Sequence, residues 1–258
     1  MPEPEETNFE DELSPPPGIQ NSPFYWGPVS AQSSYKTGRI GSPDVILSRK
    51  NIFDALDEMF KDTGIRRGSM EAMKWFRELV REMFEGTELS PEETVLRDRT
   101  RLIQKSGYKR LGGMYLFNYR PKTRAKLKYY DVVPLIFLLN YTKDGFMGLN
   151  FHYLPPKMRE RFFMLVKRHM KGNINNKWSR IELTYELLKK RKEFRYYRPC
   201  IKRYKTKYIG SRMLHIYPKD WDFAIHLPIH RFKKAYKNQV WVESRQKLVE
   251  ERAGSAEL

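Results

Sequence analysis

The distribution of charge limits what this chain can fold into. Residues 97–237 contain 36 Lys and Arg residues against 9 Asp and Glu residues, a net charge of +27, although the whole chain carries only +18. A segment with this field would repel itself unless something acidic lay against it. Phosphate is a suitable partner, because neutralising phosphates releases condensed counterions whatever the base sequence. The charge distribution therefore predicts a polyanion-binding surface.

Length and composition indicate a folded protein. The chain has 258 residues and a mass of 31.0 kDa, and 40% of its residues are hydrophobic, which is enough for a core. Its single cysteine, Cys200, excludes an internal disulfide framework and fits a reducing compartment. The longest apolar run, Val132–Leu139, is far shorter than the ~20 residues that span a bilayer. The acidic start does not resemble a signal peptide, so we expect neither secretion nor a membrane partner.

Four regions are predicted along the chain. Residues 1–45 are a flexible acidic and Pro-rich arm, because their composition cannot bury enough apolar surface to offset chain entropy. Residues 46–107 are a helical region, residues 108–240 a basic α+β domain that binds nucleic acid, and residues 241–258 a C-terminal helix and tail. Three adjacent aromatics in Pro23–Pro28 suggest that the arm docks on the protein's own body or on a partner. An arm that instead competes electrostatically with the nucleic acid is the alternative.

Three helices are predicted in the helical region. Residues 51–62 form a short amphipathic helix, and residues 70–85 place apolar side chains on one side and charged side chains on the other. Residues 90–107 form the third helix, which opens with Ser90 as N-cap, a proline at the first helical position and Glu93 as the capping-box acid. We expect these helices to pack as a subdomain, with a partner-binding helical surface as the alternative.

After Gly112 the hydrophobic pattern changes to that of β-strands. Apolar and aromatic runs at 113–119, 132–141 and 146–154 predict at least three strands. Asp144-Gly145 predicts a hairpin turn between the last two, because this pair favours the positive φ of tight turns. The fold class is therefore α+β, with the N-terminal helical region followed by a small antiparallel β unit, an open sheet or an SH3-like barrel, and flanking helices.

Further elements follow the β unit. A helix is predicted over residues 155–171 and another over 179–193, the second opened by a capping box formed by Ser179 and Glu182. Residues 211–217 read as a strand, a turn or short helix begins at Pro218, and residues 240–251 form a C-terminal helix.

The loop between the first two strands is the first candidate nucleic-acid contact. It carries a cation at every second position, and an extended backbone would place all five on one side, where they could follow a phosphate backbone. Two tyrosines come next and could stack on a base or line a sugar. An ordinary solvated loop is the alternative. The candidate residues are Arg120, Lys122, Arg124, Lys126, Lys128, Tyr129 and Tyr130.

Two further cationic sets have the same character. The helix over 155–171 carries a cationic face separated from its apolar face, with little acid for the i,i+4 pairs of a solvated helix. The stretch 195–208 alternates basic residues with tyrosines. The candidates are Lys157, Arg161, Arg168 and Lys171 in the helix, and Lys202, Arg203, Lys205 and Lys207 in the later stretch.

The sequence gives little support for catalysis. It lacks a phosphate-binding glycine loop, a zinc-protease motif and a nucleophile elbow. A metal-dependent nuclease needs converging carboxylates, and acids are sparse in the basic segment. His226 and His230 have a metal-like spacing, but Pro228 interrupts it and no third ligand is evident. His152 and His169 have structural roles in the simplest interpretation. We therefore expect no enzyme activity, no cofactor and no metal.

One block of the chain resembles the DNA end protector proteins of large contractile-tailed bacteriophages of the T-even type. The similarity covers about 120 residues, and GLNFHYLPP is its most specific part. Lys128 departs from the family pattern, where proline is expected, and adds a cation. The segments that carry the resemblance are Gly113–Tyr115, Pro121–Lys122, Tyr129–Asp131, Pro134–Leu135, Gly148–Pro155 and Trp221–Pro228.

The resemblance implies a protein of the virion that binds the terminus of packaged double-stranded DNA and shields it from host exonuclease, without chemistry of its own. It further implies a place in head completion, at the head–neck region of the particle and in the host cytoplasm during assembly and after injection. Portal, neck or head-completion virion proteins are the partners it suggests besides DNA.

Two other functions remain open from the sequence. A structural neck or head-completion protein could face DNA in a channel without preferring ends. An RNA-binding protein or ribonuclease built on an SH3-like barrel is the rival of a different class, and it would need a cation and a Thr, Ser or His over a cleft.

Overall fold

The computed structural model of the chain describes residues 52–84, 95, 101–173, 175–191, 194 and 197–253. The arm expected over 1–45, with its aromatic cluster, and the expected start of a helix at Ser90 lie outside these residues.

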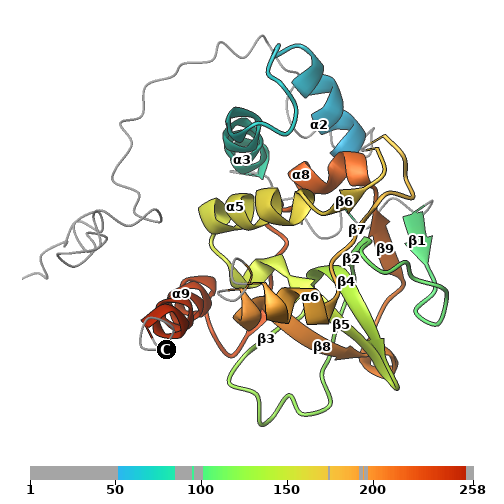
Figure 1. Ribbon diagram of the computed structural model, residues 1–258, viewed down its shortest axis with the longest axis vertical. Helices are drawn as coiled ribbons and strands as arrows, with labels where there is room; N and C mark the ends of the chain where they lie inside the picture. The colour runs from blue at the N-terminus through green and yellow to red at the C-terminus, as the bar shows by residue number, and fades with distance from the viewer. Residues whose placement is uncertain are drawn as a thin grey trace, which may run out of the picture. The chain divides into compact units, whose positions relative to one another are not determined.

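The described chain contains both helices and antiparallel strands, which confirms the α+β class (Figure 1). The helices are α2 (Ile52–Lys61), α3 (Met70–Phe84), η3 (Phe151–Tyr153), α5 (Pro156–Lys167), α6 (Tyr185–Lys190), η4 (Arg198–Cys200), η5 (Thr206–Tyr208), η6 (Pro218–Asp220), α8 (Trp221–Ala224) and α9 (Lys237–Ala253), where η marks a 3₁₀ helix. The strands are β1 (Leu102–Ile103), β2 (Met114–Leu116), β3 (Tyr130–Asp131), β4 (Leu135–Thr142), β5 (Gly145–Asn150), β6 (Met170–Lys171), β7 (Arg180–Ile181), β8 (Ile201–Lys205), β9 (Met213–Ile216) and β10 (Phe232–Lys233).

Six strands form one antiparallel sheet in the order β1-β9-β2-β4-β5-β8. The expected hairpin is present, because Thr142 at the end of β4 pairs with Gly145 at the start of β5. Its turn is Lys143–Asp144, however, and neither these residues nor Gly145 has the positive φ on which the prediction is based. Gly145 lies so close to β8 that an added Cβ would sit 1.9 Å from the carbonyl oxygen of Tyr204. A larger residue would therefore push β8 away, and with it the cations that β8 carries.

The SH3-like barrel is not confirmed. A single bridge between Tyr119 and Ile209 links the chain beyond β2 to the chain beyond β8, and the described strands otherwise form an open sheet. Two short ribbons, β10 with β3 and β6 with β7, accompany it.

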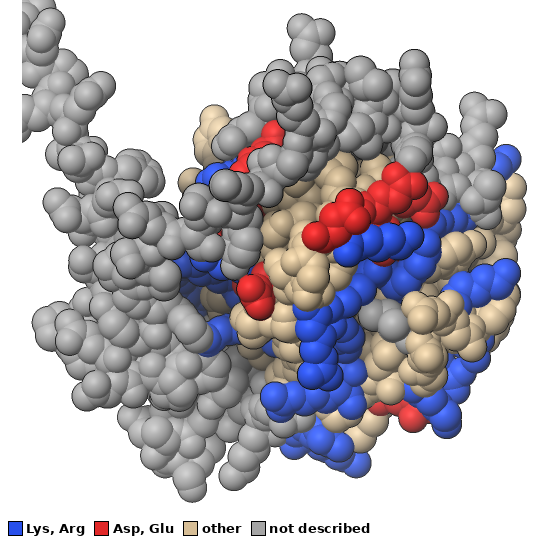
Figure 2. All heavy atoms as spheres, turned by 90° about the horizontal axis from the view of Figure 1, so that it is seen from above, with Lys and Arg blue, Asp and Glu red and all other residues tan. Residues whose placement is uncertain are grey.

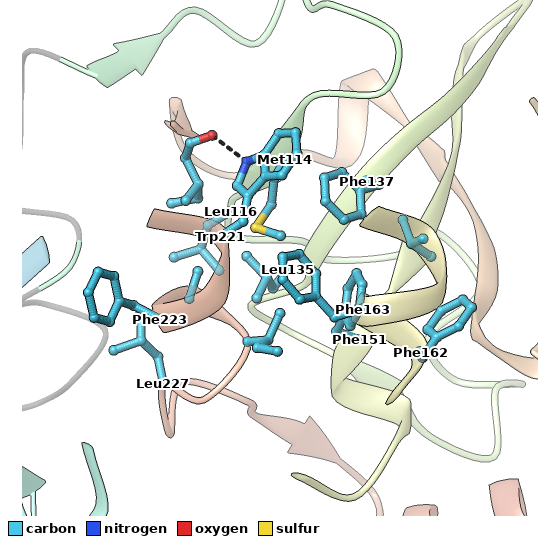
Figure 3. Packing of buried hydrophobic residues seen from close by; sticks show 14 of the residues in the cluster. Met114, Leu116, Leu135, Phe137, Phe151, Phe162, Phe163, Trp221, Phe223 and Leu227 are labelled. Carbon is cyan, nitrogen blue, oxygen red and sulfur yellow. Dashed lines mark hydrogen bonds between the residues drawn. The ribbon is translucent and has the colours of Figure 1, made fainter. Parts of the chain in front are cut away.

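The sheet has a hydrophobic cluster on each face, because successive side chains of a strand point to opposite faces. Met114 and Leu116 belong to the larger cluster, which α3, α5 and α8 cover, whereas Tyr115 belongs to the smaller one. Figure 3 shows the larger cluster, where the Trp221 indole packs edge-on against Phe137 at 4.8 Å between ring centres and donates to the Ile216 carbonyl at 3.0 Å.

The helices expected over 51–62 and 70–85 are confirmed as α2 and α3, and both bury their apolar faces in the larger cluster. Salt bridges join this region to the rest of the fold, each linking an arginine from the N-terminal part to a buried carboxylate far along the chain. The pairs are Arg67 with Asp222 at 3.2 Å, Arg77 with Glu160 at 2.5 Å and Arg101 with Asp220 at 2.5 Å.

The helix expected over 179–193 is wrong at its start. Arg180 and Ile181 form β7, and the Ser179 hydroxyl donates to the Asn173 carbonyl. The true N-cap is Thr184, whose hydroxyl accepts from the Leu187 amide at 3.2 Å. Ser179 and Glu182 match a capping box by spacing alone, and the pairing of β7 with β6 overrides that local signal.

Two other helix boundaries differ from expectation. The helix expected to reach Gly107 is wrong there, because Leu102 and Ile103 form β1, paired with β9. The helix expected over 155–171 ends at Lys167 as α5. The strand expected over 211–217 and the short helix after Pro218 are confirmed as β9 and α8, and α9 begins at Lys237, three residues before its expected start.

Candidate nucleic-acid interface

The loop over residues 120–130 is exposed but not extended. The Lys126 amide donates to the Thr123 carbonyl at 2.9 Å, and the Leu127 amide donates to the same oxygen at 3.1 Å, so its middle is a helical turn. The prediction that five cations lie on one side assumes an extended backbone, and that assumption is wrong. The side chains of residues 122–128 are nevertheless all exposed to solvent.

Both ends of this loop are attached to the fold. At its start, the Tyr119 amide donates to the Val132 carbonyl at 2.7 Å and the Arg120 amide donates to the Tyr208 carbonyl at 3.0 Å. Across its middle, the Lys234 ammonium donates to the carbonyls of Ala125 and Leu127. The cationic loop is therefore held against η5 and the chain after β10.

A buried polar network fixes the far end of the loop. The Asn150 side-chain amide donates to the Asp131 carboxylate at 2.9 Å, and His152 Nδ1 lies 2.8 Å from the same oxygen. Burial lowers the pKa of His152, and Asp131 opposes this only in part, so the neutral ring donates its Nδ1 proton to the carboxylate. The Tyr204 hydroxyl accepts from Asn150 at 3.1 Å. The conspicuous GLNFHYLPP segment thus has a structural role, as expected for His152.

The candidates in β8 and η5 lie beside the start of the loop. Arg203 and Lys205 both pair with Asp144 of the β4–β5 turn, at 2.8 and 2.6 Å, and these contacts hold the pKa of Asp144 at about 2. The Lys207 ammonium lies 5.3 Å from the centre of the Tyr208 ring. The structure therefore brings the β8 and loop candidates together, but Asp144 already forms ion pairs with two of the β8 cations.

The four candidates expected on one helix face lie in different elements. Lys157 is exposed and Arg161 is half-buried near Tyr197, both on α5. Arg168 is the C-cap of α5, and Lys171 lies beyond the helix in β6, where it pairs with Glu182 at 3.2 Å. A continuous cationic helix face is therefore wrong as an interpretation of these residues, because the helix ends before two of them.

The end of the loop contributes to a pocket that sequence reasoning missed. Lys128 pairs with Glu243 of α9 at 2.8 Å, and Tyr129 packs against Tyr153 with ring centres 6.1 Å apart. Tyr129 lines a cavity of about 260 Å³ together with residues of η3, η4, β8 and α9. Tyr130, by contrast, pairs in β3 with Lys233. No single local pattern marks the position of this pocket, because its lining residues come from four separate segments between Tyr129 and Lys247.

Five carboxylates of the basic segment pair with cations, namely Asp144, Glu160, Glu182, Asp220 and Asp222. Glu160 and Asp222 are buried and pair with arginines, and burial raises the pKa of Asp220 to about 6 despite Arg101. Within the described ranges, no three His, Cys, Asp or Glu side chains are grouped so as to hold a metal ion. Burial lowers the pKa of His226 to about 3 and that of His230 to about 2, so both rings are neutral at physiological pH.

Charge is segregated on the face seen in Figure 2, which is the end of the fold that carries α2 and α3 and not the end with the loop. Figure 2 shows Lys and Arg forming a continuous band on the described part of one face, with Asp and Glu in small groups beside it. None of the helices in the part of the chain that the structure describes is long and apolar enough to cross a membrane.

The fold and this surface define a basic α+β protein in which buried acids neutralise internal arginines while lysines and arginines face outward. A family model described as the phage T4 terminal DNA protecting protein matches residues 50–245, and the chain belongs to this family. The resemblance inferred from the sequence is confirmed, and the match extends beyond the segments between Gly113 and Pro228 that carry it, to include α2 and α3. Neither the curated proteins nor the solved structures yield a significant match.

Proposed function

We propose that this protein binds the ends of double-stranded DNA through phosphate contacts, without sequence preference and without cleavage, and that it thereby shields the terminus from exonuclease. Membership of a family described as terminal DNA protecting supports the choice of DNA ends. The excess of cations between residues 97 and 237 supports contact with phosphates.

The observation that carries the proposal is the exposure of the loop cations and their lack of ion-pair partners among the described residues. Lys122, Arg124 and Lys126 are exposed, and none of them forms an ion pair with any residue that the structure describes. The loop is tied to the fold at its start, middle and end, so its cations reach an anionic partner from a fixed base. Phosphate contacts of this kind position a protein on DNA without reading its sequence.

The partners of the acidic groups support a role without chemistry. A nuclease that uses metal ions needs carboxylates free to bind the metal. Asp144, Glu160 and Asp220 are each held by Lys or Arg side chains, and Asp131 is bound within a buried network. We therefore assign protection to physical occlusion of the end. In the virion, such a protein acts at head completion, in the head–neck region beside the portal or neck proteins, and it enters the host cytoplasm with the DNA.

Exonuclease protection tests the proposal. Blunt linear duplex is incubated with the protein and then with a double-strand-specific exonuclease, with or without a circular duplex competitor. We expect protection that survives an excess of circular DNA. Protection that circular DNA abolishes at equal phosphate concentration would indicate binding without end preference, as for a structural neck protein. Tight binding to RNA with no protection of DNA would favour the RNA-binding alternative.

A pair of matched variants makes the test specific to the loop. In the first, Lys122, Arg124 and Lys126 are replaced by Ala, which should reduce protection. In the second, three exposed cations of the helical region, Lys61, Arg66 and Lys74, are replaced by Ala, so that the net charge is identical. Figure 1 places these helices at the opposite end of the fold from the loop. Equal loss of protection in both variants would show that total charge, rather than the loop, is responsible.

A further inference from the structure

The pocket beside the loop is lined by cations from two separate parts of the chain. Arg198 of η4 and Lys202 of β8 come from one part of the chain, and Lys247 of α9 comes from another. None of the three forms an ion pair within the described ranges, whereas other cations nearby do, such as Lys128 with Glu243. Positive side chains therefore converge on a hollow that holds no acid of its own among its lining residues.

The walls and size of the pocket suit one nucleotide end. Tyr129 and Tyr153 provide aromatic walls, and the Ser244 hydroxyl is available as a donor. The volume of about 260 Å³ is just below the roughly 300–1,000 Å³ of sites for drug-sized ligands. Aromatic surface beside cations is the combination that binds single nucleotides by stacking and charge.

Lys202 shows that the pocket is short of negative charge. Its ammonium lies 4.0 Å from the centre of the Tyr153 ring. Burial, together with repulsion by Lys247, lowers the pKa of Lys202 to about 8, although the nearby Cys200 opposes this. An anion in the pocket would offset both effects, because it replaces lost solvation and separates two like charges. Glu243, the acid at the rim, already pairs with Lys128 and hydrogen-bonds with Tyr129.

We propose that this pocket binds the terminal phosphate monoester of a DNA strand, with Arg198, Lys202 and Lys247 contacting the phosphate and the two tyrosines contacting the adjoining nucleotide. A monoester carries close to two negative charges near neutral pH, against one for a phosphodiester, so three cations match a terminal phosphate better than an internal one. A strand end can also enter a pocket, whereas an internal phosphodiester must continue out on both sides. The inference rests on the proposed function and assigns the pocket as the site that binds the DNA terminus.

The test uses DNA hairpins with one blunt end that carries a 5′-phosphate, a 3′-phosphate or only hydroxyls. A dumbbell of the same sequence, closed by loops at both ends, measures binding without ends. We expect one phosphorylated hairpin to bind roughly tenfold more tightly than the hydroxyl hairpin, because charge-assisted hydrogen bonds are the strong class. The position of the preferred phosphate identifies which strand end enters the pocket.

Three variants assign the effect to the pocket. Lys202→Met and Lys247→Met each remove a charge while keeping an unbranched side chain only one atom shorter, and both should abolish the preference for the phosphorylated hairpin. Lys207→Met removes a cation outside the pocket lining, and it should weaken phosphorylated and hydroxyl hairpins equally. Because Lys247 is exposed on α9, loss of folding is not expected in that variant even if Lys202→Met is destabilised.

The outcomes separate the two proposals. If the protein prefers hairpins to the dumbbell but does not distinguish phosphate from hydroxyl, the pocket assignment is wrong and end binding stands. The same conclusion follows if the preference survives in both pocket variants. If the dumbbell binds as well as the hairpins, end binding is wrong and the pocket assignment fails with it.

Discussion

Replacing the loop cations should change the salt dependence of DNA binding by a definite amount. The variant carries Ala at Lys122, Arg124 and Lys126, whose side chains are exposed and have no ion-pair partner among the residues described. Lys128 is left in place, because Glu243 lies 2.8 Å from its ammonium and already neutralises part of its charge. Removing exposed loop charges should alter the free energy of unfolding by no more than about 0.5 kcal/mol.

The magnitude follows from the number of cations. Each phosphate neutralised on duplex DNA contributes about 0.9 to the slope of log affinity against log salt concentration. If all three side chains contact phosphates, the variant's slope should be shallower by about 2.7. Over a fourfold increase in salt, the wild-type protein should then lose about 40-fold more affinity than the variant. Lys128→Ala alone should change the slope by less than about 0.9, because its charge is shared.

Fluorescence anisotropy with a labelled blunt duplex measures this slope at several salt concentrations, and thermal unfolding of each variant checks that the fold is intact. The triple variant at Lys61, Arg66 and Lys74 is the control for net charge, and its slope should match the wild-type slope. A loop variant with an unchanged slope and an intact fold would refute the reasoning, and it would show that the loop is merely solvated.

Three further predictions concern other parts of the molecule. Affinity for a phosphorylated end should fall by up to about tenfold per pH unit above pH 8, because Lys202 has a pKa of about 8 in the free protein and must take up a proton to bind. Measurement of binding between pH 7 and 9.5 tests this. The Lys202→Met variant should lose the pH dependence. Arg101→Ala should cost about 3–5 kcal/mol at pH 8, because it leaves the buried Asp220 unpaired. That cost should shrink on acidification, since burial raises the folded-state pKa of this carboxyl above its unfolded value and protonation then favours the fold; denaturant unfolding at pH 5 and pH 8 provides the comparison. Labelled DNA should remain intact with Mg²⁺ or Mn²⁺ present. Glu186 in the first turn of α6 is an exposed carboxylate of the basic segment, and cleavage that Glu186→Gln abolishes would contradict the assignment of a role without catalysis.

Elements with a strong local signal could be predicted from the sequence. The apolar period of α3 and the short hairpin between β4 and β5 each depend on neighbours only a few positions away, although the turn is Lys143–Asp144 and not Asp-Gly. The capping box at Ser179 had an equally clear local signal and failed, because β7 pairs with β6 and the helix begins at Thr184 instead. Local rules therefore identified elements wherever no distant strand competed for the same residues.

Some features of the candidate site could likewise be predicted from the sequence, and others could not. Exposure of the loop cations could be predicted, because a run of lysines and arginines without acids stays in water. The ion pairs formed by other cations could not be predicted. Lys128 pairs with Glu243, and Arg77 pairs with Glu160, only after α9 and α3 have packed. The same holds for the pocket, where Tyr129, Lys202 and Lys247 converge from three distant segments. The only sequence signal was the alternation of tyrosines with cations, which marks suitable chemistry but not its position.

The buried network explains how a loop that is mostly solvent-exposed can present charge from a fixed position. Asp131 is the last residue of β3, directly after the loop, and it is bound by Asn150 at the end of β5 and by His152 of η3. A flexible loop would lose conformational entropy on binding DNA, and each ordered side chain would weaken the complex. Because the network, the η5 contacts and Lys234 hold the backbone beforehand, less of that entropy remains to be lost. On the proposed function, Asn150 and His152 of the GLNFHYLPP segment therefore contribute to DNA binding without touching DNA, by fixing the loop that does.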